Sequence, residues 1–137
     1  MPESVSEQLG HVELFAGLNQ EELREIASRC VVMVYPAGAQ IAVQGGPTAG
    51  FQLILRGSAT VTVNGVERPS LGEGGYFGEM SLLDGASPSA TVTAGPEGLR
   101  TSVLSQLAFM PILDSHPDMA RHIIGVLVRR LRAAESK

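Results

Sequence analysis

One glycine-rich stretch in the middle of the chain holds most of the residues that could do chemistry. It covers residues 74–85, with the sequence GGYFGEMSLLDG, and residues 87–92 follow it as SPSATV. The pattern predicts a loop, a single helical turn and a return into a strand. Backbone N–H groups exposed at such a turn form a concavity that binds anions. Because the carboxylate of Glu79 beside it can accept hydrogen bonds from sugar hydroxyls, a sugar phosphate is the ligand that this stretch favours.

Short β-like runs surround this stretch and are expected to position it. The most specific signal is Asn64-Gly65 between two valines, which is typical of a type I′ hairpin turn. We also expect Gly95-Pro96-Glu97-Gly98 to be a turn between two strands. Many short strands with turns between them predict an antiparallel sandwich or small barrel. The predicted strands cover residues 31–35, 39–43, 51–55, 59–63, 90–94 and 100–104.

Helical patterns flank the β region on both sides. Asn19 is a suitable N-cap for a helix whose first turn contains Glu21 and Glu22. Near the other end, a short helix is predicted over residues 106–113, and Pro117 favours the start of a longer one that runs to about residue 134. We therefore expect one domain over residues 1–137, with helices in 5–30, a β-barrel in 31–105 containing residues 74–92, and helices in 106–135.

Composition and charge exclude several classes of protein. Apolar residues make up 44% of the 137 residues and charged residues 18%, which excludes a disordered chain. No apolar run approaches the roughly 20 residues that span a bilayer, and the first residues do not resemble a secretory signal, so we expect no membrane partner and a cytoplasmic location. The net charge of −4 argues against a nucleic-acid partner. A single cysteine, Cys30, excludes an intramolecular disulfide.

The residues of the central stretch resemble those of the cyclic nucleotide-binding domain family. FGEMSLL at 77–83 with SATV at 89–92 is similar to the family's phosphate-binding cassette. LFAGL at 14–18, Pro36-Ala37-Gly38 and LILRG at 53–57 resemble its helical entry, a strand turn and its central strand. The resemblance covers nearly the whole chain. It implies a mainly β fold, an antiparallel β-barrel or jelly roll with flanking helices, and a regulatory role with cAMP or cGMP as the ligand.

The resemblance also implies which residues would bind that ligand. In the family, backbone amides at the turn and one arginine neutralise the cyclic phosphate, while the cassette glutamate binds the ribose 2′-hydroxyl. In the catabolite activator branch, an arginine on the last helix pairs with this glutamate, and Arg130 matches it here. The residues that match the family's ligand-binding positions are Gly78, Glu79, Met80, Ser81, Ser89, Ala90 and Arg130.

The cassette departs from the family's pattern at one position, where Pro88 replaces the phosphate-binding arginine. Two functions remain open. In the first, the chain is a sensor that binds cAMP or a related nucleotide weakly or in altered fashion and signals through its C-terminal helix. In the second, it is a degenerate domain that serves as a protein-interaction module. Either would act through a partner protein or a homodimer.

An apolar stripe on the last helix is a candidate dimer seam; alternatively, it packs on the chain's own barrel. The stripe consists of Met119, Ile123, Leu127 and Leu131.

The sequence gives little support to an enzyme. It contains no nucleophile elbow, cysteine–histidine arrangement, zinc-protease motif or Walker loop. Its three histidines are scattered, so we expect neither a metal nor a cofactor.

Overall fold

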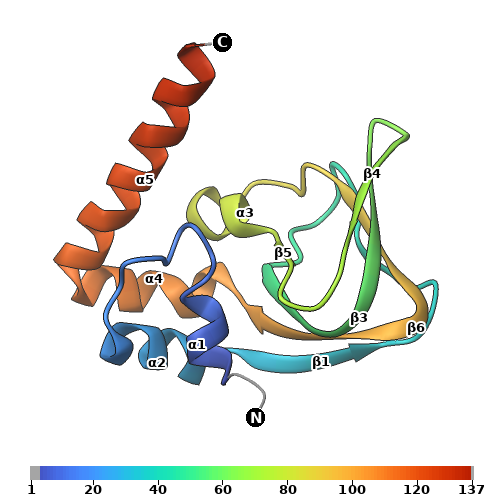
Figure 1. The fold of residues 1–137 in the computed structure, drawn as a ribbon, viewed down its shortest axis with the longest axis horizontal. Coiled ribbons are helices and arrows are strands. Elements are labelled where there is room, and N and C mark those ends of the chain that lie inside the picture. Colours follow the sequence, from blue (N-terminus) through green and yellow to red (C-terminus); the bar gives the residue numbers. More distant parts are fainter. Residues whose placement is uncertain (1–3, 137) are drawn as a thin grey trace. The chain divides into compact units, whose positions relative to one another are not determined.

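The computed structural model describes residues 4–136, which form two compact units (Figure 1). The helical unit contains the residues up to Arg29 and those from Ala108 onward, and the β unit is Cys30–Leu107. The expectation of a single domain over residues 1–137 stays a prediction. Among the described residues, no helix is both long enough and apolar enough to cross a lipid bilayer.

The helices begin where local capping favours them. The helical unit contains α1 (Val5–Leu9), α2 (Gln20–Ser28), most of α4 (Gln106–Ser115) and α5 (Pro117–Glu135). The predicted cap of α2 is confirmed, because the Asn19 side chain accepts a hydrogen bond from the Glu22 N–H at 2.8 Å. The Glu22 carboxylate accepts one from the Asn19 N–H at 3.0 Å, which completes a capping box. Pro117 is the first residue of α5, as predicted.

The predicted seam on α5 is not a single exposed stripe. Met119 and Ile123 are buried, at 0% and 3% exposure, and Leu127 is half-buried. Of the four predicted residues, only Leu131 is largely exposed, at 60%. The helix instead presents a neighbouring apolar face that consists of Ile124, Val128 and Leu131.

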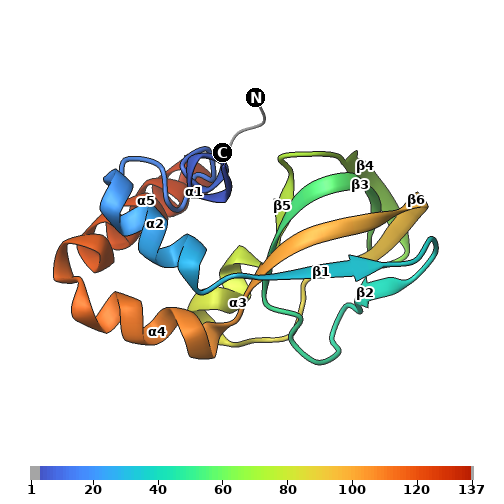
Figure 2. The same cartoon turned by 90° about the horizontal axis from the view of Figure 1, so that it is seen from below.

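The β unit is an antiparallel sheet of six strands with one short helix, α3 (Glu79–Asp84) (Figure 2). β6 lies between β1 and β3, and β4 lies on the other side of β3. The shorter strands β2 and β5 pair with β6 and β3 respectively. This confirms the predicted antiparallel β architecture with flanking helices. The strands are β1 (Val31–Tyr35), β2 (Gln40–Ala42), β3 (Phe51–Val63), β4 (Val66–Leu71), β5 (Tyr76–Phe77) and β6 (Thr91–Leu104).

Two pairs of predicted strands are in fact single long strands. The predictions at 51–55 and 59–63 merge in β3, and those at 90–94 and 100–104 merge in β6. The turn predicted at Gly95–Gly98 is wrong: Gly57 pairs with Leu99 and Ala59 with Ala94, so residues 95–98 bulge opposite a single residue of β3. Because both halves of β6 keep pairing with the same partner strand, the glycines change the register and not the chain direction.

The hairpin predicted at Asn64-Gly65 is confirmed. It joins β3 to β4, and both of its central residues have positive φ, +52° and +77°, as a type I′ turn requires.

The interior of the β unit combines apolar residues with several buried polar side chains, of which Gln52 has the most hydrogen bonds. Gln52 is 2% exposed, and its carbonyl oxygen accepts hydrogen bonds from the Thr101 hydroxyl at 2.8 Å and the Tyr35 hydroxyl at 3.1 Å. Its amide nitrogen donates to the carbonyl of Ala49 at 3.0 Å. A buried polar group with these partners ties β1, β3 and β6 together, and its hydrogen bonds offset the cost of removing it from water. The apolar cluster contains Ala42, Ile54, Ala59, Val92, Ala94 and Leu99.

The single cysteine, Cys30, is half-buried beside this sheet. Burial raises the pKa of its thiol, and a hydrogen bond with the Ser102 side chain lowers it by less, so the net shift is upward. The thiol is therefore neutral at pH 7 and a weak nucleophile.

A substitution at Gly57 tests whether the close approach of β3 and β6 requires a residue without a Cβ atom. The φ of Gly57 is +91°, and a Cβ placed on it would lie 2.3 Å from the carbonyl oxygen of Gly98. We expect Gly57→Ala to lower the free energy of unfolding by at least about 2 kcal/mol, because it adds a backbone clash to the strain of a left-handed conformation. Urea unfolding measures this loss. Gly38→Ala is the control, since Gly38 has φ +79° but no atom within 4 Å of its Cβ position; equal losses in both variants would contradict the clash.

Candidate functional site

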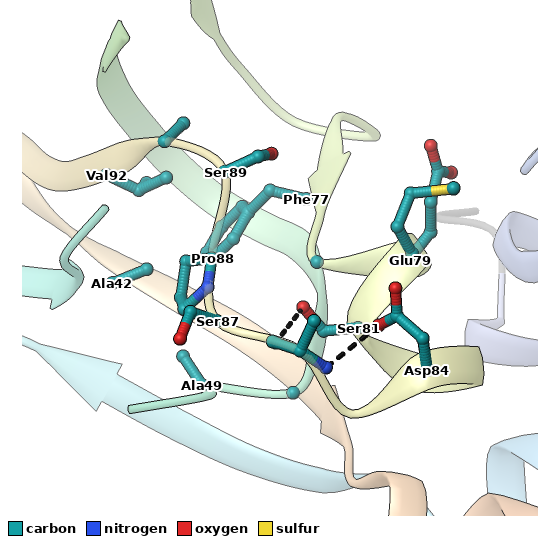
Figure 3. A pocket seen from close by; sticks show the side chains of 15 residues that line it. Ala42, Ala49, Phe77, Glu79, Ser81, Asp84, Ser87, Pro88, Ser89 and Val92 are labelled. Atoms are coloured by element: carbon teal, nitrogen blue, oxygen red, sulfur yellow. Dashed lines mark hydrogen bonds between the residues drawn. The ribbon is translucent and has the colours of Figure 1, made fainter. Parts of the chain in front are cut away.

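A pocket of about 440 Å³ opens in the β unit beside α3 (Figure 3). This volume is in the range of small-molecule sites. Every predicted ligand-binding residue of the central stretch lines it. These residues are Gly78, Glu79, Met80, Ser81, Ser89 and Ala90.

The sequence analysis missed the part of the pocket wall that comes from outside the central stretch. Ala42 at the end of β2 and Ala49 and Gly50 before β3 line the pocket, together with Val92 of β6. Their small or apolar side chains form no motif, so no local signal could assign them to a site. Gln44-Gly45 has the composition of a bend, but composition does not show that the segment between β2 and β3 faces the cassette.

Gly78 fixes how α3 enters the pocket wall. It is the N-cap of α3 with φ +83°, and a Cβ on it would lie 2.1 Å from the carbonyl oxygen of Gly50. A side chain at this position would therefore clash with the backbone that lines the pocket. Glycine allows the start of α3 to lie directly against the segment before β3.

The loop after α3 is held by two side chains of that helix. The buried Ser81 hydroxyl donates to the carbonyl of Ala86 at 2.9 Å, and the Asp84 carboxylate accepts from the Ala86 N–H at 2.9 Å (Figure 3). Both backbone groups of Ala86 are thus bound to α3. The loop that carries Pro88 and Ser89 therefore leaves the helix in a defined direction.

The far end of the same loop is tied to the segment after β2. The carbonyl of Pro88 accepts a hydrogen bond from the Gly45 N–H at 3.0 Å, and the Gln44 N–H donates to the Thr91 hydroxyl at 3.0 Å. Gln44 is itself held by Asn64 through two hydrogen bonds of 2.8 Å. The loop is therefore anchored at both ends although proline replaces the expected arginine.

The charge of the pocket wall is negative. Among the described residues that line it, Glu79 and Asp84 carry carboxylates and none carries a cationic side chain. Glu79 is half-buried, and its Oε2 atom is shielded from solvent. Pro88 lines the pocket with a ring that has no N–H to donate. An anion in this pocket would be bound by backbone amides and hydroxyls such as that of Ser89, without a positive charge from the wall.

Arg130, the remaining predicted site residue, belongs to the helical unit. Its guanidinium Nε donates to the carboxylate of Glu13 in the same unit, and the two side chains are 30% and 59% exposed. Its pairing with Glu79 stays a prediction.

The fold and the cassette define a family. Residues 32–116 match the model of the cyclic nucleotide-binding domain, which is more than half of the chain. The chain therefore belongs to the cyclic nucleotide-binding domain family, and the resemblance seen in the sequence is confirmed.

Three known proteins illustrate the breadth of the similarity. The chain is 34% identical over 115 residues to a cAMP-dependent protein kinase regulatory subunit of Aspergillus niger, covering 82% of this chain and 28% of that protein. The crystal structure of the Thermus thermophilus catabolite activator protein has a TM-score of 0.70 and 33% identity, covering 90% of this chain and 60% of that one. Glutaminase 2 of Bradyrhizobium diazoefficiens is 30% identical over 137 residues, covering 96% of this chain and 22% of the protein.

The Ser81 hydroxyl provides a test of how the loop is held. We expect Ser81→Ala to lower the free energy of unfolding by about 1 kcal/mol, because the hydrogen bond from the buried Ser81 hydroxyl to the carbonyl of Ala86 is lost. Amide hydrogen exchange should become faster at Ser87 and Ser89. Ser87→Ala is the matched control, because Ser87 is exposed on the same loop. Unchanged exchange in Ser81→Ala would show that the hydrogen bond does not position the loop.

Proposed function

We propose that this chain is a regulatory domain that binds a cyclic nucleotide, or a related nucleotide, weakly in the cassette pocket and has no catalytic activity of its own. The observation that carries the proposal is the convergence of Gly78–Ser81 and Ser89–Ala90 on one pocket of ligand size. The name of the kinase regulatory subunit, which is cAMP-dependent, supports the ligand class. The proposal includes a cytoplasmic location, which the single cysteine favours.

In this proposal, the ribose and the phosphate of the nucleotide are each bound by residues of the pocket. The Glu79 carboxylate accepts a hydrogen bond from a ribose hydroxyl, and the phosphate lies against the backbone amides at the start of α3 and the hydroxyl of Ser89. Pro88 contributes only apolar contact where an arginine would donate two charge-assisted hydrogen bonds. At about 1.5–3 kcal/mol for each hydrogen bond to a charged group, the loss of two weakens binding by roughly two to four orders of magnitude.

The glutaminase similarity does not favour an enzyme. The match includes only 22% of that protein's length, so it indicates a shared module within a longer chain. The A. niger regulatory subunit is likewise matched over 28% of its length. Both support a domain that reports ligand binding to other parts of a protein or to a partner.

Pro88 also favours the alternative function. A pocket whose described lining residues carry two carboxylates and no cationic side chain suits an interaction module that has lost its ligand. The two functions predict different ligand responses when a positive charge is restored at position 88. A sensor pocket with intact geometry will respond to an arginine at position 88, whereas a degenerate pocket will not.

A thermal melt with cAMP and cGMP up to millimolar concentration tests the proposal. We expect a small increase in Tm for the chain as it is, and a much larger one for Pro88→Arg at equal ligand concentration. A ligand at 100 times its Kd adds about 2.7 kcal/mol of stability, which is readily visible in a chain of this size. Isothermal titration should give a Kd for cAMP that is roughly a hundred- to ten-thousandfold lower in Pro88→Arg.

Two further variants control this experiment. Pro88→Gln adds a long uncharged side chain and should bind more weakly than Pro88→Arg. Glu79→Ala in the Pro88→Arg background should remove most of the gain, because the sugar loses its acceptor. If neither cyclic nucleotide stabilises any of these variants, the sensor function is wrong and the interaction module is the better account.

The proposal also includes two roles for α5: the helix transmits the effect of ligand binding, and its exposed face forms a homodimer. Ile124, Val128 and Leu131 are 59%, 43% and 60% exposed. Their spacings of four and three residues place them on one face of the helix. Exposed apolar side chains at this spacing suit pairing with the same face of a second copy.

Measurement of the oligomeric state tests whether this face of α5 forms a dimer. We expect the chain to sediment as a dimer and the double variant Ile124→Glu with Leu131→Glu to sediment as a monomer, because charges would be buried without partners. Ala133→Glu is the control, since Ala133 is exposed on the opposite side of α5. A monomer at all concentrations, or equal dissociation by the control, would contradict a dimer through this face.

A further inference from the structure

One edge of the β sheet consists of apolar residues that are exposed to solvent. β1 is the outermost strand beside β6 (Figure 1), and its first four residues, Val31–Val34, are 61%, 47%, 43% and 72% exposed. Successive residues of a strand point to opposite faces. Both faces of β1 are therefore apolar and accessible, and its outer edge pairs with no other strand of the described residues.

β1 has none of the features that usually protect an edge strand. Such edges are blunted by charged side chains, proline or bulges, because an open edge pairs with other chains. The opposite edge of the sheet has these features: β4 contains Glu67, Arg68 and Pro69, and its pairing with β3 is irregular. In contrast, Val31–Tyr35 contains no charge and no proline, and it pairs with β6 without a register shift.

Two arginines lie next to this apolar edge. Val34 pairs with Arg100 of β6, and Arg100 pairs with Arg56 of β3, so the three side chains form a row on one face of the sheet. Both arginines are exposed, and no described residue forms an ion pair with either. Like charges directly opposite each other on adjacent strands repel. The row is a local positive site in a chain whose net charge is −4.

We propose that β1 is a docking edge for an extended acidic segment of a partner protein, which adds to the sheet as a further strand. The main chain of the segment would pair with the open edge of β1, and its apolar side chains would contact Val32 and Val34 on one face and Val31 and Met33 on the other. Its acidic side chains would neutralise Arg100 and Arg56. This surface shares no residue with the lining of the cassette pocket, so the proposal does not depend on the ligand.

The distances allow this charge pairing. Neighbouring strands lie about 4.8 Å apart, so a residue of the added strand opposite Val34 would be about 9.6 Å from the backbone of Arg100. A glutamate and an arginine side chain extended over the valine can meet across this gap. Arg56 is one strand further away and acts mainly by raising the local positive potential.

Charge complementarity also makes a second copy of β1 a poorer partner for this edge than an acidic segment. Two copies of β1 could pair their main chains, but Val31–Tyr35 contains no carboxylate for Arg100 and Arg56. Self-pairing would leave both arginines without a counter-charge. An acidic segment of a different protein satisfies the edge and the charges together.

Two synthetic nonapeptides test the proposal, one with alternating valine and glutamate and one with alternating valine and lysine. Fluorescence anisotropy at about 50 mM salt should show binding of the glutamate peptide at least about tenfold tighter than that of the lysine peptide. The double variant Arg56→Gln with Arg100→Gln should weaken it at least about threefold. Arg68→Gln, which removes the same charge from β4, should leave it unchanged. Hydrogen exchange should slow at β1 amides when the glutamate peptide binds.

Several results would overturn the proposal. These are equal affinity for the two peptides, no binding of the glutamate peptide up to millimolar concentration, or the same loss in Arg68→Gln as in the double variant. Self-association that Val34→Glu abolishes and the α5 variants do not would assign the edge to a second copy instead. Because the cassette variants leave this surface intact, failure of the nucleotide experiment and failure of the peptide experiment are independent.

Discussion

The long antiparallel pairing of β3 with β6 is the constraint on which the rest of the β unit depends. β3 begins directly after Gly50, which lies against Gly78 at the start of α3, and β6 begins directly after the cassette loop. The pairing of Thr62 with Thr91 therefore closes the segment that contains β4, β5, α3 and the cassette loop. Gln52, buried in the same strand, donates to the carbonyl of Ala49 in the pocket wall, so the interior of the sheet and the site share a hydrogen-bond network.

The cassette could be predicted from the sequence because its residues are contiguous and its chemistry is local. Glycines at 78 and 85 delimit one helical turn, and both have positive φ in the structure. The rest of the pocket wall could not be predicted, because Ala42, Ala49 and Gly50 reach it only through the pairing of distant strands. The predicted number of strands was wrong for a related reason. Gly95–Gly98 has the composition of a turn, yet the pairing of both flanking halves with β3 makes it a bulge. Composition indicates where a chain can bend, but the partner strand decides whether it reverses.

The replacement of arginine by Pro88 changes the electrostatics of the pocket while the described loop keeps its anchors. The loop is held by Ser81 and Asp84 at one end and by Gly45 at the other, and none of these contacts uses the side chain at position 88. Geometry and charge are thus separate properties of this site. A pocket can keep the shape of its family and lose affinity for an anion, because shape comes from backbone hydrogen bonds and affinity from a side chain that projects into the cavity.

Exposed apolar residues form groups of three or more on two separate elements, the strand β1 and the helix α5, and each group follows the repeat of its own secondary structure. On β1 the residues are consecutive, so both faces of the strand are apolar, whereas on α5 they recur every three or four residues and form a single face. A strand edge offers main-chain hydrogen bonds to any extended segment, and only the adjacent arginines make it selective for acidic ones. A helix face has no free main-chain groups, so its selectivity depends on the fit of side chains, which an identical face can supply by symmetry. The chemistry of each surface therefore favours a different kind of partner: a foreign extended segment for β1 and a second copy of the chain for α5.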